Sequence, residues 1–596
     1  MAEENKEQLQ SIRHSLAHLL ADSLKQLFPG SLNAIGPAIE NGFYQDFEIK
    51  GDFGEDDLKK VEKKMKETLK SWQGFERREV NLEEALEVFS NNKYKQELAK
   101  EFAEGGKTLT IYTSGDFVDL CKGGHVEDIK QINPDAFKLT KTAGAYWRGD
   151  EKNIMLTRVY GVAFETKEQL DKYIEMLEEA KKRDHRKLGK ELDLFTFSDM
   201  VGSGLTLWSP RGTILRKGLN DYVQELRDSY DYQEVTTPHI TKKELFQASG
   251  HWAKFSDELF KTTTREGHEF SLKPMSCPMH AQIYASQPRS YRDLPIRYRE
   301  TAFVYRDEQS GELSGLSRVR CITQDDAHVF CRTTQIEEET LKIWDIIDKF
   351  YGNLGFSDLK IMFSTHDPED MSAYAGDEEK WMQSEEQLLK IIKNKVGDEY
   401  TVGVGEAAFY GPKIDFMAFD AIGREHQLAT IQLDFNQPEG FDLTCVNETS
   451  EAERVVMIHA AIMGSIERFL SVYIEHTGGK FPIWLAPEQL RIIQVKDSPE
   501  LDAFVDEITA SAKSAGIRVS TDRSNESVGK KIREAEMMKV PYTIVVGEKE
   551  LETKLLSPRV RSDIAVENRE EKSYPVDNFL TSIVNESNGR VQKSSL

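Results

Sequence analysis

Apolar residues recur every three or four positions in the segment TKEQLDKYIEMLEEAKKRDHRKLGKEL, which begins at Thr166; they are Leu170, Tyr173, Ile174 and Leu177. This spacing places apolar side chains on one face and predicts an amphipathic helix. Thr166 and Gln169 stand at the two positions of a capping box, which would fix the first turn. We interpret residues 166–192 as a linker helix that follows a separate domain at 1–165.

The segment before this helix mixes two hydrophobic periods. A helical pattern near 10–28 is followed by strand candidates that glycine interrupts, such as IGPAIENGFYQDFEI. Residues 1–165 are therefore expected to form an accessory α+β domain.

The remainder of the chain divides into two further patterns. Residues 193–485 alternate long amphipathic helices with β-rich stretches such as LKIMFSTH and REHQLATIQLDF, and this block is large enough for a sizeable catalytic core. From RIIQV to YTIVVG the order is strand, helix, strand, helix, strand. That order predicts a small α/β domain with a mainly parallel sheet at 486–590. The tail, 591–596, is expected to be disordered.

Composition limits the class of protein. With 596 residues, of which 39% are hydrophobic and 30% charged, the chain can form several cores. No apolar stretch approaches the roughly 20 residues that span a bilayer, and the start, MAEENKEQLQ, has no apolar signal region. We expect a cytoplasmic protein without a membrane partner. The five cysteines are an odd, scattered set, which favours reduced thiols or metal ligands over disulfides.

The net charge of −24 taken alone argues against a nucleic-acid partner, because phosphate binding needs local cations. Composition averages over surfaces, however, and the basic run KKRDHRKLGK lies between acidic stretches. By itself this run is interpreted as a solvated helix face.

Three residues of metal-binding type lie far apart in the central block. Cys277 is in KPMSCPMH, His328 in TQDDAHVF and His459 in MIHAAIMGSIERF. No spacing rule connects them, and each taken singly has an ordinary interpretation as a buried core residue. The motifs around them change this interpretation.

The central block resembles the class II aminoacyl-tRNA synthetases. LPIRYRETAFVYRDEQSGELSGLSRVRCITQDDAHVF is similar to motif 2, two antiparallel strands joined by a loop, and GSIERFL is similar to motif 3. ILRKGLNDYVQELRDSY with YQEVTTPHI is similar to motif 1, which implies a homodimer. The segments at all three metal positions resemble the threonyl-tRNA synthetases, and the resemblance runs from Ser11 onward. It implies an antiparallel-sheet catalytic core between an N-terminal α+β editing domain and a C-terminal α/β anticodon-binding domain.

The resemblance also implies catalytic roles. Arg306 would contact the α-phosphate of ATP and the threonine carboxylate, Arg468 the γ-phosphate, and Glu308 the adenine amino group, with Lys413 beside the site and Mg²⁺ bridging the phosphates. Arginine suits such positions because its planar fork binds phosphate bidentately and stays charged. One departure is Ile322, where the family commonly has a phenylalanine that stacks on adenine.

By this resemblance Cys277, His328 and His459 would hold one catalytic zinc per chain. Two imidazoles and a thiolate leave an open coordination position. Threonine could fill it with its amino and hydroxyl groups, whereas valine lacks the hydroxyl and would be rejected by about 10⁴ or more. Asp326 would orient one of these groups. The other positions implied in substrate binding are Gln324, Arg318, Tyr410, Gln427, Gln432 and Ser465.

Serine keeps the hydroxyl and lacks only a methyl group, which is worth only about 1–3 kcal/mol of discrimination. A separate hydrolytic site is therefore expected. The N-terminal domain offers two pairs of residues at i and i+4 spacing, in HSLAH and DLCKGGH. By resemblance the editing site that hydrolyses seryl-tRNA comprises His14, His18, Lys95, Asp119, Cys121 and His125. The same ligand types leave open a second zinc, as in alanine-type editing domains.

The C-terminal domain resembles an anticodon-binding domain, and the resemblance implies contacts from Asn525, Glu550 and Arg559. Polar side chains of these types can read exposed base edges of a single-stranded loop. Only about a dozen residues precede HSLAH, so the chain corresponds to a short form without the extra N-terminal domain of many bacterial members, or to a truncated one.

The sequence thus predicts an ATP-dependent ligase that joins threonine to tRNA(Thr) through threonyl-adenylate. Two alternatives come from other classes. A synthetase-like RNA-binding regulator should have lost the phosphate-binding arginines, but Arg306 and Arg468 are both present. A free-standing metal hydrolase acting on mischarged tRNA would need only residues 1–165 and leaves the central motifs without a role.

Overall fold

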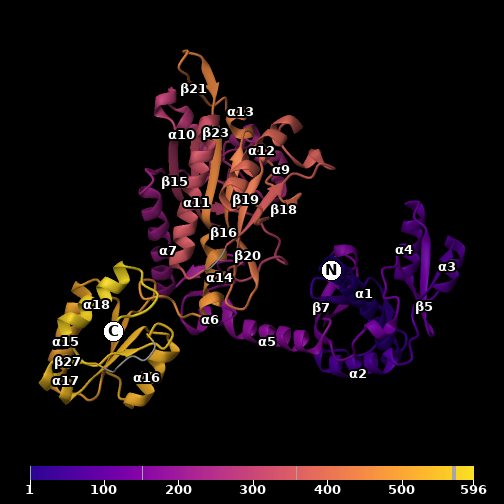
Figure 1. The fold of residues 1–596 in the computed structure, drawn as a ribbon, viewed down its shortest axis with the longest axis horizontal. Helices are drawn as coiled ribbons and strands as arrows, with labels where there is room; N and C mark the ends of the chain where they lie inside the picture. The colour runs from indigo at the N-terminus through magenta and orange to yellow at the C-terminus, as the bar shows by residue number, and fades with distance from the viewer. Residues whose placement is uncertain (1, 151, 357–358, 567–571) are drawn as a thin grey trace. The chain divides into compact units, whose positions relative to one another are not determined.

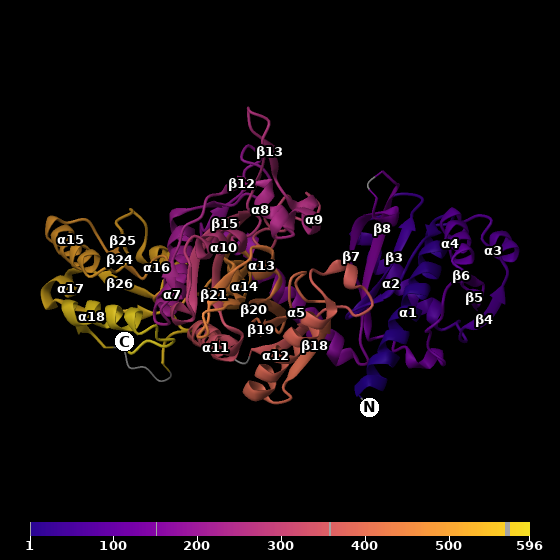
Figure 2. The same cartoon turned by 90° about the horizontal axis from the view of Figure 1, so that it is seen from above.

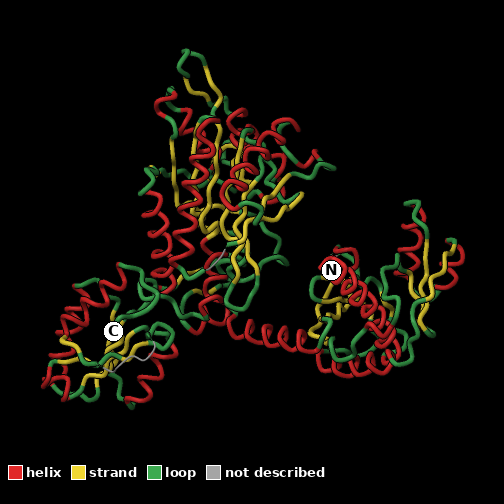
Figure 3. The backbone as a smooth tube through the Cα atoms, in the orientation of Figure 1, coloured by secondary structure: helices red, strands yellow, loops and turns green. Residues whose placement is uncertain are grey.

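The computed structural model describes residues 2–150, 152–356, 359–566 and 572–596. The chain forms two compact units, which divide after Glu179. Helices and strands are mixed in both units (Figure 3).

The N-terminal unit is built on a five-stranded antiparallel sheet of order β1-β3-β8-β7, with β2 paired to β3. Helices α1 and α2 pack against this sheet (Figure 2), and Leu16, Leu20, Phe43, Phe47 and Val159 are among the buried residues of the shared core. The bounds are α1 (Ala2–Leu27), β1 (Leu32–Asn33), β2 (Ala38–Ile39), β3 (Gly42–Glu48), α2 (Leu58–Leu69), β7 (Phe137–Tyr146) and β8 (Met155–Ala163).

A second, smaller layer in this unit has its own core around Tyr94, Leu98 and Ile111. It consists of β4 (Glu76–Val80), β5 (Leu109–Ser114), β6 (Phe117–Leu120), α3 (Leu82–Val88) and α4 (Lys93–Glu104). The expected α+β class of the N-terminal domain is confirmed.

The expected linker consists of two helices, α5 (Lys167–Arg183) and α6 (His185–Glu191). The capping box is present: the Gln169 backbone N–H donates to Thr166 Oγ1 at 3.2 Å, and the Thr166 N–H donates to Gln169 Oε1 at 3.2 Å. These bonds satisfy backbone donors that the first turn of a helix leaves free.

The second unit contains an eight-stranded sheet of order β11-β15-β16-β23-β20-β19-β17-β18, antiparallel from β15 through β17 (Figure 1). Helices α7 and α11 pack on one another and on strands of this sheet. The core includes Ile343, Ile347, Phe416, Ile431 and Ile458. The strands are β11 (Gln233–Glu234), β15 (Ile296–Tyr305), β16 (Cys321–Cys331), β17 (Lys360–Thr365), β18 (Tyr400–Val404), β19 (Lys413–Phe419), β20 (Glu425–Asp434) and β23 (Val456–Ser465).

Helices and short strands flank this sheet. The helices are α7 (Pro210–Asp228), α8 (Lys243–Ala248), α9 (His251–Lys254), α10 (Cys277–Ala285), α11 (Ile336–Asn353), α12 (Glu378–Val396), α13 (Asn436–Gly440) and α14 (Ile466–Thr477). The short strands are β9 (Phe195–Thr196), β10 (Leu207–Trp208), β12 (Ile240–Lys242), β13 (Lys261–Thr263), β14 (Glu269–Leu272), β21 (Thr444–Val446) and β22 (Ala452–Arg454). The expected β-hairpin of motif 2 is β15 and β16, and the strand entering a helix in motif 3 is β23 and α14.

The C-terminal part has the predicted order β24 (Leu490–Gln494), α15 (Pro499–Ser514), β25 (Val519–Asp522), α16 (Val528–Met537) and β26 (Tyr542–Val546). Its sheet has the order β25-β24-β26-β28, and the first three strands are parallel. The chain then forms α17 (Glu548–Thr553), β27 (Leu555–Leu556), β28 (Arg559–Val560), β29 (Tyr574–Pro575) and α18 (Val576–Asn588).

The prediction of a disordered tail is wrong. Leu596 is buried in the C-terminal core, and the Ser594 N–H donates to the Ile564 carbonyl at 2.8 Å. The Ser595 N–H donates to Glu586 Oε1 at 2.6 Å. A terminal leucine with a hydrophobic contact and paired neighbours is held in place, although the polar composition of the segment suggested otherwise. Among the helices of the described residues, none has the length and apolar character to cross a bilayer.

Candidate active site and editing centre

The central site is built on register in the eight-stranded sheet. His328 on β16 and His459 on β23 are direct cross-strand partners, and Gln432 on β20 is the next partner of His459. Because side chains alternate between the two faces of a strand, Gln324, Asp326 and His328 project from the same face of β16. Three neighbouring strands therefore bring their polar residues to one place.

Cys277 completes the predicted metal cluster from outside the sheet. It is the first residue of α10, and its sulfur lies with one ring nitrogen of each histidine inside a group whose atoms are all within 4.8 Å of one another. His328 Nε2 and His459 Nδ1 are 3.2 Å apart. Two nitrogens bound to a tetrahedral zinc at about 2.0–2.1 Å would lie about 3.3–3.4 Å apart. The spacing and the donor types of these three buried residues fit a zinc ion.

The orientation of His459 is fixed by Asp434, whose Oδ2 lies 2.9 Å from His459 Nε2. Because an ionised carboxylate only accepts hydrogen bonds, Nε2 carries the proton and Nδ1 presents its lone pair toward His328. Carboxylates that hold a ligating histidine in this way are a regular feature of metal sites.

A small cavity of about 110 Å³ adjoins these three residues. Of the residues predicted to bind the amino acid, Gln324, Asp326, Tyr410 and Gln432 line it, and Arg306 also contributes. The Tyr410 hydroxyl donates to Gln432 Oε1. The size and the polar lining suit a small amino acid.

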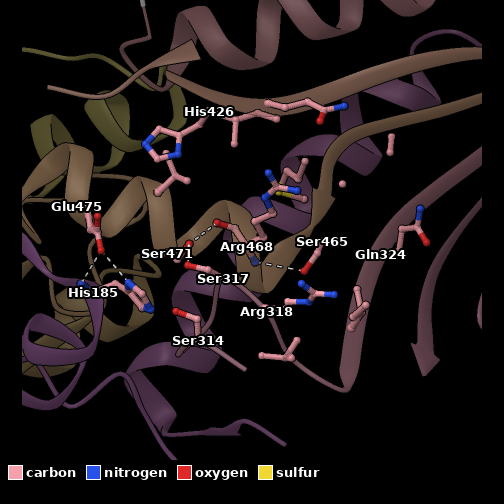
Figure 4. A pocket seen from close by; sticks show the side chains of 18 of the residues that line it. His185, Ser314, Ser317, Arg318, Gln324, His426, Ser465, Arg468, Ser471 and Glu475 are labelled. Carbon is pink, nitrogen blue, oxygen red and sulfur yellow. Dashed lines mark hydrogen bonds and ion pairs between the residues drawn. The ribbon is translucent and has the colours of Figure 1, made fainter. Parts of the chain in front are cut away.

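A larger cavity of about 840 Å³, shown in Figure 4, shares the lining residues Arg306 and Gln324 with the small one. It contains Glu308, Arg468 and Ile322, and the remaining predicted substrate residues Arg318, Gln427 and Ser465. Cations and hydrogen-bonding groups thus surround a space large enough for a nucleotide.

Two arginines approach this larger cavity from different elements. Arg306, which follows β15, has its guanidinium carbon 5.3 Å from the Phe255 ring centre, and its buried Nε has no hydrogen-bond partner among the described residues. Arg468 lies in the first turn of α14, where its N–H donates to Ser465 Oγ at 3.2 Å (Figure 4). Arginine side chains and a helix N-terminus together form a favourable environment for phosphate.

Two predicted catalytic residues have protein partners. Arg318 Nε donates to Glu308 Oε2 at 2.7 Å, so the motif 2 loop is closed on itself by an ion pair. Lys413 on β19 forms an ion pair with Asp415 at 3.0 Å. Among the described residues that line the two cavities, Lys413 is not included. Of these two residues, Glu308 lines the larger cavity, whereas Lys413 lines neither of the two cavities.

At one end of the larger cavity, His185 connects the linker to the motif 2 loop (Figure 4). This buried residue begins α6; its Nδ1 lies 2.7 Å from Glu475 Oε1 on α14, and its Nε2 accepts from the Leu316 N–H at 3.1 Å. A Cβ added to Gly315, which has φ +50°, would lie 2.3 Å from His185 Nε2. The sequence analysis did not single out His185 or Glu475.

The six predicted editing residues form one cluster in the N-terminal unit. His14 and His18 lie one turn apart on α1, and Cys121 and His125 lie in the loop after β6. Cys121 Sγ is 3.3 Å from His14 Nε2, and His14 Nε2 is 3.3 Å from His18 Nε2. Asp119 Oδ2 lies 3.1 Å from His18 Nδ1, and Asp119 Oδ1 forms an ion pair with Lys95 Nζ at 2.6 Å.

Charge interactions shift the pKa values in this cluster. Burial opposes ionisation of Asp119, but Lys95 and His18 hold its pKa well below the ordinary value. Burial also disfavours protonated His18, yet its bonds to Asp119 and Cys121 raise its pKa to about 9. For Cys121, the raising effect of burial is outweighed by interactions with the neighbouring His125, His14 and His18, so its pKa falls to about 3. Both shifts favour a Cys121 thiolate beside a charged His18 at neutral pH.

Several buried polar residues near the central site were missed by the sequence analysis. They are His251, whose Nε2 lies 3.9 Å from Cys277 Sγ, and His280, Glu300 and Asp434. Burial lowers the pKa of His251 to about 4. Only His280 had a sequence signal, because it ends the motif KPMSCPMH three residues after Cys277.

In the C-terminal part, Glu550 and Arg559 line a common cavity of about 790 Å³. Glu550 also caps α17 by accepting from the Gly547 N–H at 3.0 Å. Asn525 is exposed between β25 and α16 and, within the described part of the chain, is not among the residues that line this cavity.

Comparisons with known proteins agree with this organisation. The family models that match are described as tRNA synthetase class II core domain (G, H, P, S and T) over residues 260–477, anticodon binding domain over 489–586, and threonyl and alanyl tRNA synthetase second additional domain over 109–160. The sheet, the arginine-lined cavity and these matches define the chain as a class II aminoacyl-tRNA synthetase.

Curated relatives narrow this class. Threonine–tRNA ligase from Porphyromonas gingivalis is 47% identical over 560 residues, which cover 92% of this chain and 84% of that protein. The Deinococcus deserti threonine–tRNA ligase is 44% identical over 587 residues, 97% of this chain and 89% of that protein. A crystal structure described as the RNA binding domain of threonyl-tRNA synthetase from Cryptosporidium parvum matches with a TM-score of 0.64 and 36% identity, covering 69% of this chain and 99% of that one. The chain belongs to the threonine–tRNA ligase family.

Proposed function

We propose that this enzyme activates threonine with ATP, transfers it to tRNA(Thr), selects it with one zinc ion per chain, and hydrolyses seryl-tRNA in its N-terminal unit. The observation that carries the proposal is the juxtaposition of Cys277, His328 and His459 with a polar cavity of about 110 Å³ that opens into the arginine-lined cavity. An amino acid and a nucleotide can then meet at Arg306.

The chain's own residues have distinct roles in activation. Arg306, shared by both cavities, holds the threonine carboxylate and the α-phosphate together, and Arg468 at the start of α14 holds the γ-phosphate. Glu308, oriented by Arg318, receives the adenine amino group, and Ile322 lies where an aromatic residue would stack. Mg²⁺ would accompany the phosphates; Lys413, paired with Asp415 outside both cavities, has no contact with them in this proposal. Fixed cations favour the reaction because negative charge grows on the α-phosphate as pyrophosphate leaves.

Selection of threonine follows from the small cavity. A zinc ion held by the three ligands would supply an open coordination position for the amino and hydroxyl groups of threonine. Asp326 accepts from one of these groups, and Gln324, Tyr410 and Gln432 limit the space around the methyl group. Valine presents a methyl group in place of the hydroxyl and leaves these polar groups unpaired, which is costly in a buried site.

Serine fits the same cavity, and its rejection is assigned to the N-terminal unit. His14, His18, Cys121 and His125 surround one point, and Lys95 and Asp119 hold His18 in its charged form. Such a cluster can position the 3′ end of tRNA and a water for hydrolysis of the ester bond.

Two further elements complete the proposal. Glu550 and Arg559 in their shared cavity, together with exposed Asn525, contact bases of the anticodon loop. The motif 1 helix α7 with β11 supplies the surface for a homodimer.

The test is amino-acid-dependent exchange of pyrophosphate with ATP, followed by charging of tRNA(Thr). Threonine should support exchange with zinc present, and the Glu550→Ala and Arg559→Ala variants should keep exchange but charge tRNA with a raised KM for tRNA. Exchange supported by another amino acid and not by threonine would show the proposed specificity to be wrong.

A further inference from the structure

A chain of buried hydrogen bonds runs away from His328 on the side opposite the cluster. His328 Nδ1 lies 2.8 Å from His280 Nδ1, and His280 Nε2 lies 3.3 Å from Glu300 Oε2. His280 is on α10, three residues after Cys277, and Glu300 is on β15. His280 is fully buried, and Glu300 is nearly so.

The charge of Glu300 determines which atom donates in each hydrogen bond between Glu300, His280 and His328. Its carboxylate accepts from the Thr237 N–H at 2.7 Å and from Thr237 Oγ1 at 2.9 Å, with Lys273 Nζ at 3.4 Å. Burial opposes ionisation, but the bonds from His280 and Thr237 and the charge of Lys273 lower the pKa of Glu300 to about 2. An ionised carboxylate cannot donate, so His280 Nε2 carries a proton and donates to it.

The proton on His280 Nε2 determines which nitrogen of His328 carries a proton. The two Nδ1 atoms are 2.8 Å apart, so one ring donates to the other; with His280 neutral and donating from Nε2, its Nδ1 accepts the proton of His328 Nδ1. His328 Nε2 is then left with a lone pair. Asp326 Oδ1 lies 3.6 Å from His328 Nε2, which is too long for a hydrogen bond.

The same logic holds for the partner strand, where Asp434 leaves the lone pair of His459 on Nδ1. In these tautomers, His328 Nε2 and His459 Nδ1, which lie 3.2 Å apart, both carry lone pairs. Two facing lone pairs repel unless a cation lies between them. Simple core packing gives no reason to orient both rings in this way.

We propose that His280 and Glu300 are positioning residues that fix the tautomer of His328, so that Nε2 is presented to a divalent cation beside Cys277 and His459. This inference rests on the proposed zinc site and assigns two further residues to it. His280 acts through His328 and does not touch the ion. Removal of such supporting partners typically weakens metal affinity by about 10–100-fold.

The test uses the full-length protein and measures zinc affinity by competition with a chromogenic chelator. His280→Leu removes the acceptor and should weaken zinc binding about 10–100-fold. His280→Asn keeps an oxygen near the position of Nδ1 and should restore affinity to within about threefold of the original protein, as one restored hydrogen bond predicts. The cobalt-substituted protein gives a second readout, because a disturbed ligand changes its visible absorption.

His366→Leu is the matched control. His366 is also buried, with Nδ1 2.6 Å from Glu385 Oε1, but it directly follows β17, is not among the residues around the proposed zinc site, and should leave zinc affinity unchanged. If His280→Leu does not fold, Glu300→Gln is the second variant. The neutral amide of glutamine can rotate to offer His280 either a donor or an acceptor, so it no longer fixes the tautomer. Zinc affinity should then fall about tenfold.

The outcomes separate the two proposals. An unaltered protein that binds no zinc would overturn the proposed function. An unaltered protein that binds zinc, together with a folded His280→Leu or Glu300→Gln variant of equal affinity, would overturn the roles of His280 and Glu300 alone.

Discussion

His18 Nδ1 and Asp119 Oδ2 lie 3.1 Å apart in the N-terminal unit, and both side chains are almost fully buried. Lys95 bonds the other oxygen of the same carboxylate at 2.6 Å. Because Asp119 is held ionised between two cations, it can keep His18 charged beside the Cys121 thiolate. The arrangement suits a site that stabilises negative charge during ester hydrolysis.

Replacing His14 and His18 with alanine should therefore slow hydrolysis of seryl-tRNA by about 100-fold or more, the usual effect of losing a positioned acid or base. The measurement is deacylation of preformed seryl-tRNA. Gln26→Ala, an exposed change on the same helix, is the control. Threonine charging should not change in either variant, and unimpaired serine proofreading in the double variant would refute the editing assignment.

Two half-buried cysteines should differ in how alkylation depends on pH. The pKa of Cys121 is lowered to about 3, so its thiolate is already formed from pH 5 to pH 8. Burial and the nearby Glu467 raise the pKa of Cys321 to about 11, so its thiolate fraction grows tenfold per pH unit over the same range. Iodoacetamide labelling followed by peptide mass spectrometry should give a flat profile for Cys121 and a rising one for Cys321. A tenfold rise per unit at Cys121 would contradict the thiolate assignment.

Arg306→Lys keeps the positive charge but removes the planar fork that can bind a carboxylate and a phosphate together. Threonine-dependent pyrophosphate exchange should fall about 10²–10³-fold in kcat/KM, as for loss of one preorganised donor. Arg332→Lys is the control, because Arg332 pairs with Glu448 and Glu453 at the surface of the same unit. Equal losses in both variants would show that Arg306 has no special role.

His185→Phe should raise the KM for ATP about tenfold, because the Leu316 N–H and the Glu475 carboxylate lose their shared partner and the motif 2 loop loosens. The KM for threonine should change little. His185→Gln, whose amide oxygen can accept from Leu316, should recover part of the loss. His476→Phe is the control, since His476 stacks on Phe356 at 4.2 Å near the end of α14. Unchanged ATP kinetics in His185→Phe would exclude this role.

The sequence predicted the helices and strands correctly where a local pattern of residues determines the structure. Helical spacing and the Thr166–Gln169 capping box located α5, and the strand–helix order predicted the parallel sheet of the C-terminal part. The cluster of Cys277, His328 and His459 was inferred from resemblance, because its geometry depends on cross-strand register between residues 131 positions apart. Register of that kind cannot be read from spacing in a single chain.

The residues that the sequence missed act through partners distant in the chain. Glu300 and Asp434 are ordinary acidic residues until folding brings them to His280 and His459. His185 lies in a basic run that was interpreted as a solvated face, but Leu316 and Glu475 bury its ring. The prediction of a disordered tail was wrong for a similar reason. Leu596 packs into the C-terminal core, and the polar residues next to it in the sequence gave no sign of this contact.

Cys277, His328 and His459 are proposed to hold a zinc ion that selects threonine by its hydroxyl. The most direct test measures bound zinc and amino-acid-dependent pyrophosphate exchange in the unaltered protein and in Cys277→Ser. The unaltered protein should bind one zinc per chain and favour threonine over valine by about 10⁴ or more. Cys277→Ser should lose zinc and at least about 100-fold of its threonine activity, in line with loss of a metal ligand. Full threonine activity in a zinc-free Cys277→Ser variant, or equal activation of valine and threonine by the zinc-bound protein, would contradict the account.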